Sequence, residues 1–263
     1  MIDRELSELL LEEAVRINRP EFVEKDPVQF PRRFSNVRDI EIAALLTAAI
    51  SWGKRSMILR KADSMLSMMG NEPYRYMTER GYEDLDGVQN LHRTFFARDL
   101  QWYLRGLREI YARHGSLDSF AAHIGAGGDS APAWRLAAEM HKIITDANGG
   151  ATCAQCIPTN LTTTALKRIN MALRWLVRDD GIVDIGVWKS IPKNRLFIPL
   201  DVHSGNTARE LGILQRKAND RKSAEIITEA AREICPDDPA LLDFALFGLG
   251  VSGEINRLGQ NIS

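Results

Sequence analysis

Apolar residues recur three and four positions apart along most of this chain, and that spacing constrains its fold more than any other feature. The segment 38–52 is the clearest case, because Ile42, Leu45, Leu46 and Ala49 fall on one face of a helix. Strand-like alternation of apolar and polar residues is scarce. The sequence therefore predicts an all-α fold, with no repeat of fixed period.

Short polar and glycine-rich segments mark where the expected helices begin and end. Asn36 or Ser35 is the expected N-cap of the helix over 38–52, and Gly70 and Gly115 are expected to end two later helices. The segments 124–131 and 148–160 are expected to be loops. Further helices are expected over 56–70, 95–115, 132–147, around Lys167, from Val202, over 220–234 and over 238–253.

The chain has 263 residues, of which 44% are apolar, and this is enough to fill one compact core. Its acidic, amphipathic N-terminus lacks the basic start and apolar run of a signal peptide. No apolar stretch approaches the length that crosses a membrane. We therefore expect a cytoplasmic protein without a membrane partner.

Charge is distributed unevenly along a chain whose net charge is -1. Between Asn160 and Lys222, twelve lysines and arginines stand against six acidic residues, so this segment carries +6 and the remainder -7. The overall charge excludes a globally basic nucleic-acid binder, whereas the basic segment is typical of a local phosphate-binding face.

Cysteine usage also bears on the compartment and on metal binding. The three cysteines, an odd number, do not suit a disulfide framework and fit a reducing compartment. Cys153 and Cys156 form one CxxC pair, which would be half of a zinc site or a redox pair. Because no second CxxC exists, we expect no metal.

The segment FIPLDVHSGNTARELGI, residues 197–213, contains a candidate catalytic acid. Pro199 drives Ile198 toward extended geometry, and Asp201 is then the natural N-cap of the helix from Val202. A carboxylate fixed at a helix N-terminus has two possible roles. It either only caps the helix or also stabilises positive charge on a substrate.

The helix around Lys167 supplies a possible partner for Asp201. Its apolar stripe faces the core, while Lys167, Asn170, Arg174 and Arg178 follow three- and four-residue steps on a separate, mostly basic face. The irregular stretch after this helix would allow the chain to turn back and place Asp201 next to Lys167. A lysine beside a carboxylate in a basic groove is a candidate amine nucleophile, although most such lysines are solvated surface charges.

Two stretches resemble the helix-hairpin-helix DNA glycosylase superfamily. IPLDVHSGNTARELGI is similar to the segment after the hairpin, where an aspartate in a VDxH context caps a helix that ends in RLGL-like residues. RDIEIAALLTAAIS resembles an early core helix of the superfamily, and the resemblance is strongest over about residues 160–253. Within the superfamily, the layout is most similar to the archaeal 8-oxoguanine DNA glycosylases and to a bacterial family of uncharacterised relatives.

That resemblance implies a fold and a function. The fold would be a two-lobed helical bundle over 1–263, with lobes at 30–150 and 155–255 and the site in the cleft between them. The function would be a monomeric DNA glycosylase, with AP lyase activity, that removes an oxidised purine such as 8-oxoguanine from double-stranded DNA. The alternative is a non-catalytic helix-hairpin-helix-like module that binds DNA.

The resemblance also implies roles for individual residues. Asp201 matches the catalytic aspartate, and Lys167 matches the lysine that forms a Schiff base with deoxyribose. Asp243 and Phe247, four apart on the late helix, would hold the extruded base. Trp52 would fill the gap that the base leaves. DNA phosphates would be contacted by Arg174, Arg178, Lys189, Lys193, Arg195 and Arg209.

The sequence departs from the superfamily in three respects. The usual hairpin, with a GxG turn, a lysine and an alanine, is not visible. The interval from Lys167 to Asp201 is longer than in the endonuclease III branch. The iron-sulfur cysteine spacing of that branch is absent, so we expect no cluster and no other cofactor.

Overall fold

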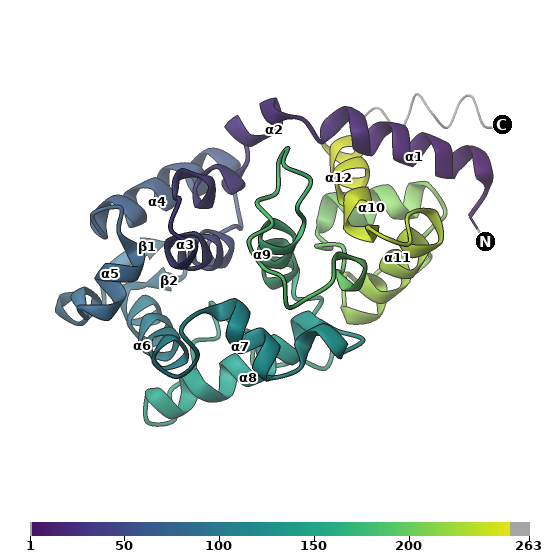
Figure 1. Cartoon of the computed structure of the whole chain (residues 1–263). Coiled ribbons are helices and arrows are strands. Elements are labelled where there is room, and N and C mark those ends of the chain that lie inside the picture. The colour runs from purple at the N-terminus through teal and green to yellow at the C-terminus, as the bar shows by residue number, and fades with distance from the viewer. Residues whose placement is uncertain (1, 253–263) are drawn as a thin grey trace.

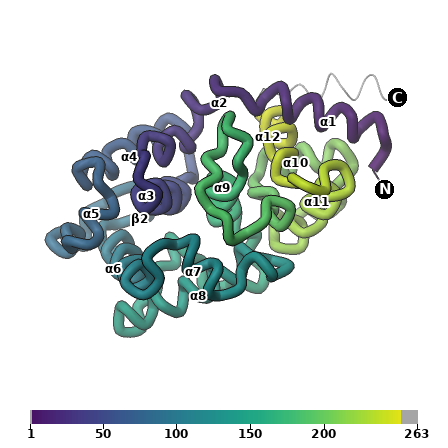
Figure 2. The backbone as a smooth tube through the Cα atoms, viewed as in Figure 1, coloured from purple at the N-terminus to yellow at the C-terminus, as the bar shows by residue number. Residues whose placement is uncertain are grey.

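The computed structural model describes residues 2–252, which are mostly helical, and this confirms the predicted all-α class. Helix α9, Lys167–Val177, lies between the helices of the first half of the chain and those of the C-terminal part (Figures 1 and 2). Helix α1, Arg4–Ile17, packs along α12, Leu242–Ser252. The N-terminal helix therefore joins the C-terminal group rather than the segment that follows it.

The remaining helices fall into three runs along the chain. Short helices lead from α1 into the core: α2 Pro20–Glu24, η1 Pro27–Gln29 and η2 Pro31–Arg33. The next run is α3 Val37–Ala49, α4 Arg55–Met68, α5 Pro73–Thr78, η3 Gly81–Asp84, α6 Ala97–His114, α7 Leu117–His123, η4 Ala126–Gly128 and α8 Pro132–Ala147. After α9 follow η5 Lys193–Arg195, α10 Val202–Glu210, α11 Arg221–Ile234 and η6 Pro239–Leu241.

A two-stranded antiparallel ribbon interrupts the helices of the first half. Strands β1, Asn90–His92, and β2, Phe95–Phe96, pair directly before α6. The predicted helix over 95–115 therefore begins two residues later than its apolar spacing indicated, and it ends, as predicted, at Gly115. There φ is +76°, a left-handed value that glycine adopts without a side-chain clash.

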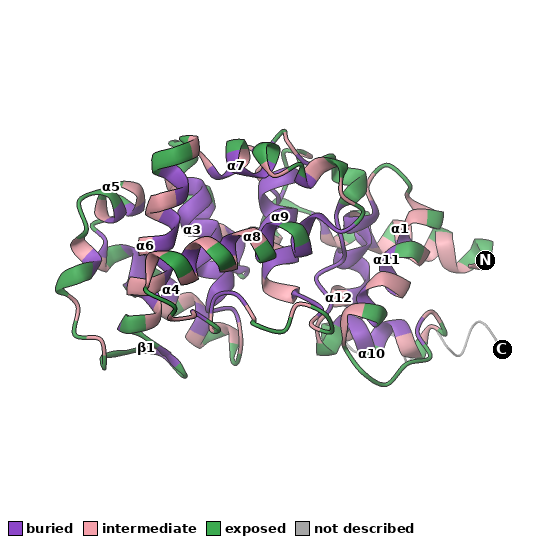
Figure 3. Ribbon diagram, turned by 90° about the horizontal axis from the view of Figure 1, so that it is seen from below, coloured by how far each residue is buried: buried purple, intermediate pink, exposed green. Residues whose placement is uncertain are grey.

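Helix α3 is the buried centre of the first half (Figure 3). The Asn36 side chain caps it by accepting a hydrogen bond from the Arg38 amide at 2.9 Å, as predicted. Residues 40–49 are all buried, so this helix is covered on every side. It packs against α9, and this contact sets the position of α9 in the molecule.

Glu41 carries a charge into the middle of α3, where burial raises the pKa of its carboxyl. Four groups donate to it: Tyr111 Oη at 2.7 Å, the amides of Leu117 and Asp118 at 3.1 and 3.0 Å, and Trp188 Nε1 at 2.9 Å. These donors belong to α6, to α7 and to the segment before η5. One buried carboxylate therefore connects three separate parts of the chain to α3.

The end of α3 differs from the prediction in a way that shapes the site. The helix ends at Ala49 rather than continuing to Trp52, and Gly53, with φ +95°, turns the chain into α4. Ser51, Trp52 and Gly53 are thereby released from the helix and line cavities. None of the helices within residues 2–252 is long and apolar enough to cross a membrane.

Candidate functional site

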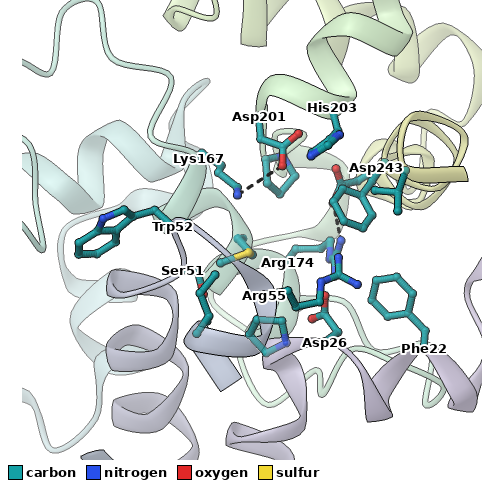
Figure 4. A pocket seen from close by; sticks show the side chains of 17 residues that line it. Phe22, Asp26, Ser51, Trp52, Arg55, Lys167, Arg174, Asp201, His203 and Asp243 are labelled. Carbon is teal, nitrogen blue, oxygen red and sulfur yellow. Dashed lines mark hydrogen bonds and ion pairs between the residues drawn. The ribbon is translucent and has the colours of Figure 1, made fainter. Parts of the chain in front are cut away.

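The N-termini of α9 and α10 bring Lys167 and Asp201 together. Lys167 is the first residue of α9, Asp201 is the N-cap of α10, and Lys167 Nζ lies 3.4 Å from Asp201 Oδ2 (Figure 4). The two side chains retain 34% and 15% of their accessible surface, so a ligand can reach both. The irregular segment 178–200 thus returns the chain to Lys167. A site in which Lys167 and Asp201 act together requires this arrangement.

The two oxygens of the Asp201 carboxylate have different partners. Oδ1 accepts hydrogen bonds from the Ser204 amide at 2.9 Å and from Ser204 Oγ at 3.1 Å, while the Asp201 amide donates to Ser204 Oγ at 2.9 Å. This reciprocal cap confirms the predicted N-cap role. Oδ2 remains directed toward Lys167. The cap therefore fixes the carboxylate without consuming the oxygen that faces the lysine.

A strained backbone precedes Lys167. Leu166 has φ +50° and ψ +38°, the left-handed conformation that branched residues rarely adopt. Asn170 Nδ2 donates to the Ala165 carbonyl at 3.0 Å and holds this turn from inside the helix. Strain of this kind clusters at functional sites, because it fixes a side chain that a relaxed turn would direct elsewhere. Here it directs the first side chain of α9 toward Asp201.

Two cavities adjoin the Lys167–Asp201 pair. The inner cavity has a volume of about 480 Å³ and the outer cavity about 520 Å³, each within the range of small-molecule sites. The residues that line both are Ser51, Trp52, Gly53, Lys167, Asp201 and His203. The pair therefore stands at the junction of the two cavities, within reach of a ligand that extends from one into the other.

The inner cavity combines aromatic walls with charged side chains. Phe22 and Phe247 contribute rings, and the Arg55 guanidinium lies 5.0 Å from the centre of the Phe247 ring. Asp26 and Arg55 lie on the side opposite Lys167 and Asp201 (Figure 4). A cavity with aromatic walls and charged groups on opposite sides suits a planar polar ligand.

The outer cavity is bounded by Trp52 and by the segment before α9. The Trp52 ring packs edge-on against the His92 ring, with 4.9 Å between the two ring centres. The Arg168 guanidinium lies 5.0 Å from the centre of the Trp52 ring. Cys156 also lines this cavity, but both Cys153 and Cys156 are buried, and burial raises the pKa of the Cys156 thiol well above its ordinary value. The Cys156 thiol is therefore a weak nucleophile in the folded protein.

Arg174 and Arg178 are buried, so the prediction that they contact DNA phosphates is wrong. Their side chains retain only 5% and 1% of their accessible surface. Arg174 pairs with Asp243 and with Asp184, the latter at 3.3 Å, and Arg178 pairs with Asp184 and with Asp238, the latter at 2.9 Å. A guanidinium in a low-dielectric interior requires such partners, because an unpaired buried charge is strongly destabilising.

Asp243 and Phe247 both line the inner cavity, as their predicted role in holding an extruded base requires. Asp243 is buried and its Oδ2 accepts a hydrogen bond from Arg174. Burial raises the pKa of Asp243 from the ordinary 3.8 to about 6, although the Arg174 guanidinium acts in the opposite direction. Phe247 is half-buried, and its ring lies edge-on to the His203 ring, with 6.1 Å between the two ring centres. Their proposed contact with a base stays a prediction.

The other predicted phosphate contacts are not at the cavities. Lys189, Lys193 and Arg195 are exposed, but none of them lines the inner or outer cavity. Lys189 and Lys193 instead pair with Asp179 at 3.5 and 3.9 Å. Arg209 donates to the carbonyls of residues 216 and 217 and therefore stabilises the loop after α10. A role for these four side chains in DNA binding stays a prediction.

Among the residues of the inner cavity that sequence analysis missed are Phe22, Asp26 and Arg55. Asp26 precedes a proline, which signals a turn, and Arg55 lies in a basic run after Trp52. Neither pattern indicates a cavity, because the cavity forms only when α4, α9 and α12 come together. Among the described residues, no group of three or more His, Cys, Asp or Glu side chains is arranged to hold a metal ion.

Comparisons with known proteins give a family but no activity. A family model described as "Protein of unknown function (DUF2400)" matches residues 26–252. No curated protein and no solved structure matches the chain. The match spans most of the chain and includes the Lys167–Asp201 pair, the outer cavity and all residues of the inner cavity except Phe22.

Proposed function

The chain belongs to the DUF2400 family, whose function is unknown, and from the geometry of its site we propose that it is a DNA glycosylase with AP lyase activity. The proposed substrate is an oxidised purine, such as 8-oxoguanine, in double-stranded DNA. The observation that carries the proposal is the 3.4 Å contact between Lys167 Nζ and Asp201 Oδ2 at the mouth of a cavity with aromatic walls.

The two cavities suit the two parts of a flipped nucleotide. The extruded base would enter the inner cavity and stack between Phe22 and Phe247. The sugar would then lie at the junction, next to Lys167 and Asp201, and the DNA strand would follow the outer cavity past Trp52. We also propose that the fold is the two-lobed glycosylase type, with the site between the lobes.

The chemistry follows from an amine and a carboxylate at one sugar carbon. The Lys167 amine, after losing a proton, attacks C1′; the bond from C1′ to N9 breaks, and the base leaves with the electron pair and takes up a proton. Asp201 stabilises the positive charge that develops on the sugar. Opening of the sugar ring gives an imine between Lys167 and C1′, from which β-elimination cleaves the strand.

Borohydride trapping tests this proposal directly. The parent protein is incubated with duplex DNA that carries 8-oxoguanine or an abasic site, and sodium borohydride reduces any imine to a stable covalent adduct. Lys167→Ala is expected to lose the adduct on both substrates. Lys142→Ala is the matched control, because Lys142 is an exposed lysine that lines neither cavity.

Three results would contradict the proposal. An adduct that persists in Lys167→Ala would mean that another amine reacts. No adduct on either duplex, with salt-sensitive DNA binding retained, would favour a non-catalytic DNA-binding module. Absence of DNA binding even at low salt would exclude both functions.

A further inference from the structure

Asp26 is the N-cap of η1, and its carboxylate also lies on the wall of the inner cavity. It is 8% exposed and lies next to Arg55, across the cavity from Lys167 and Asp201 (Figure 4). The Val28 amide donates to its Oδ1 at 3.0 Å. Among residues 2–252, no other group donates a hydrogen bond to this carboxylate, and no side chain forms an ion pair with it.

Such a placement is costly unless a ligand compensates for it. Burial raises the pKa of Asp26, and the positive charges of Arg174, Arg55 and Lys167 offset only part of that effect. A buried carboxylate with one hydrogen bond loses most of the solvation that water would give it. The protein therefore retains a strong acceptor on the wall of a cavity, where a ligand can bind to it.

A turn role alone does not account for this burial. Asp129 makes the same local bond, since its Oδ1 accepts from the Ala131 amide two residues later at 2.8 Å. Asp129, however, is only partly buried and does not line either cavity. A cap of this kind thus functions near the surface, and the burial of Asp26 in the inner cavity indicates a ligand.

The chemistry of an ionised carboxylate limits the ligand. A carboxylate accepts hydrogen bonds and donates none, and its two oxygens match two adjacent N–H donors on a planar edge. A guanine-type base has that edge, with N1–H beside the 2-amino group. An adenine-type base has an acceptor, N1, beside its amino group, and this acceptor would face a carboxylate oxygen without a hydrogen bond.

We propose that Asp26 is the specificity-determining residue of the inner cavity and selects guanine-type bases by accepting hydrogen bonds from N1–H and the 2-amino group. This inference rests on the proposed glycosylase function. Phe22 and Phe247 supply the walls on which the base stacks, and Arg55, next to Asp26, is placed to donate to the 6-oxo group.

Excision rates on three duplexes test this inference. The duplexes carry 8-oxoguanine, 8-oxohypoxanthine, which lacks the 2-amino group, or 8-oxoadenine. The variant is Asp26→Asn, because asparagine caps as well as aspartate but presents an amide to the cavity. Asp129→Asn is the matched control. Lyase activity on an abasic site, which has no base to select, reports whether Lys167 and Asp201 still function.

The parent is expected to excise 8-oxoguanine roughly 10- to 100-fold faster than 8-oxohypoxanthine, the range for a hydrogen bond to a charged group. Asp26→Asn is expected to lose a similar factor on 8-oxoguanine and to reduce that preference to within about threefold. Its lyase activity on the abasic site stays at the parental level, and Asp129→Asn matches the parent throughout.

Several results would overturn the inference, and they differ from a failure of the proposed function. If Asp26→Asn slows all three bases equally, Asp26 is only structural. If 8-oxoadenine is the best substrate, the base class is wrong. If the variant keeps the parental preference, Asp26 does not select the base. In these cases the parent still cleaves the abasic site through Lys167. A parent without excision or lyase activity would end both proposals.

Discussion

Lys167 Nζ and Asp201 Oδ2 lie 3.4 Å apart although 33 residues of chain separate them, and each belongs to the N-terminus of its own helix. Helix N-termini carry partial positive charge, so the carboxylate of Asp201 lies where negative charge is stabilised. One carboxylate oxygen is held by Ser204 and the other faces the lysine. This division allows one residue to cap a helix and also take part in chemistry.

The first prediction separates the cap from the catalytic charge of Asp201. Asp201→Asn retains the cap, since asparagine and aspartate cap equally well, but loses the negative charge next to the sugar. Base excision is expected to fall on the order of 10²-fold with little change in stability. Asp201→Ala is expected to lose the cap as well, at a cost of about 1 kcal/mol in unfolding free energy. Single-turnover excision and urea unfolding measure the two effects, and an Asp201→Asn variant with parental excision would refute the catalytic role.

The second prediction concerns Arg178, a side chain that sequence analysis assigned to DNA. Arg178→Met removes the cation that pairs with Asp238 and one of the two that pair with the buried Asp184, so the unfolding free energy is expected to fall by about 3–5 kcal/mol. Lys189→Met is the control, because Lys189 pairs with Asp179 at the surface, where a change of at most about 1 kcal/mol is expected. Equal stability of the two variants in urea would contradict the ion-pair network.

The third prediction uses the pH dependence of Asp243. Its pKa is about 6 in the folded protein against an ordinary value of 3.8, so the native state binds this proton more readily than the unfolded state. The unfolding free energy is therefore expected to decrease as pH rises from about 4 to about 6, by up to about 3 kcal/mol from this group. Asp243→Asn should make the decrease smaller by this contribution, Asp129→Asn should leave it as in the parent, and the remainder comes from other buried carboxyls with a raised pKa, such as Asp26 and Glu41. Urea unfolding across this pH range measures both, and a decrease as large in Asp243→Asn as in the parent would show that Asp243 does not contribute.

The fourth prediction concerns Glu41, a buried residue of α3 that receives four hydrogen bonds from three separate parts of the chain. Glu41→Gln replaces one acceptor oxygen with an amide that faces N–H and O–H donors, so buried donors lose their partner. The unfolding free energy is expected to fall by about 3 kcal/mol. Trp188 donates to Glu41, so its fluorescence follows the loss of packing. Glu79→Gln, at an exposed ion pair with Arg75, should behave as the parent does.

Local sequence patterns determined the parts of this protein that depend only on neighbouring residues. Asn36 and Asp201 were predicted as N-caps because a short polar side chain at a helix entry bonds the amide two or three residues later. The all-α class followed from apolar spacing for the same reason. The helix after 95 began late because the pairing of β1 with β2 competes with it, and pairing between strands is not visible in helical spacing.

Tertiary structure alone decided which polar faces are buried and which groups meet. Arg174 and Arg178 follow the steps of an exposed basic face, yet carboxylates from Asp184, Asp238 and Asp243 reach them, and helical spacing cannot distinguish solvent from such partners. Asp26 has a local turn signal, but its place in the site exists only because separate helices enclose a cavity around it. Burial depends on contacts between distant segments, and burial is what turns an ordinary charged side chain into a candidate functional group.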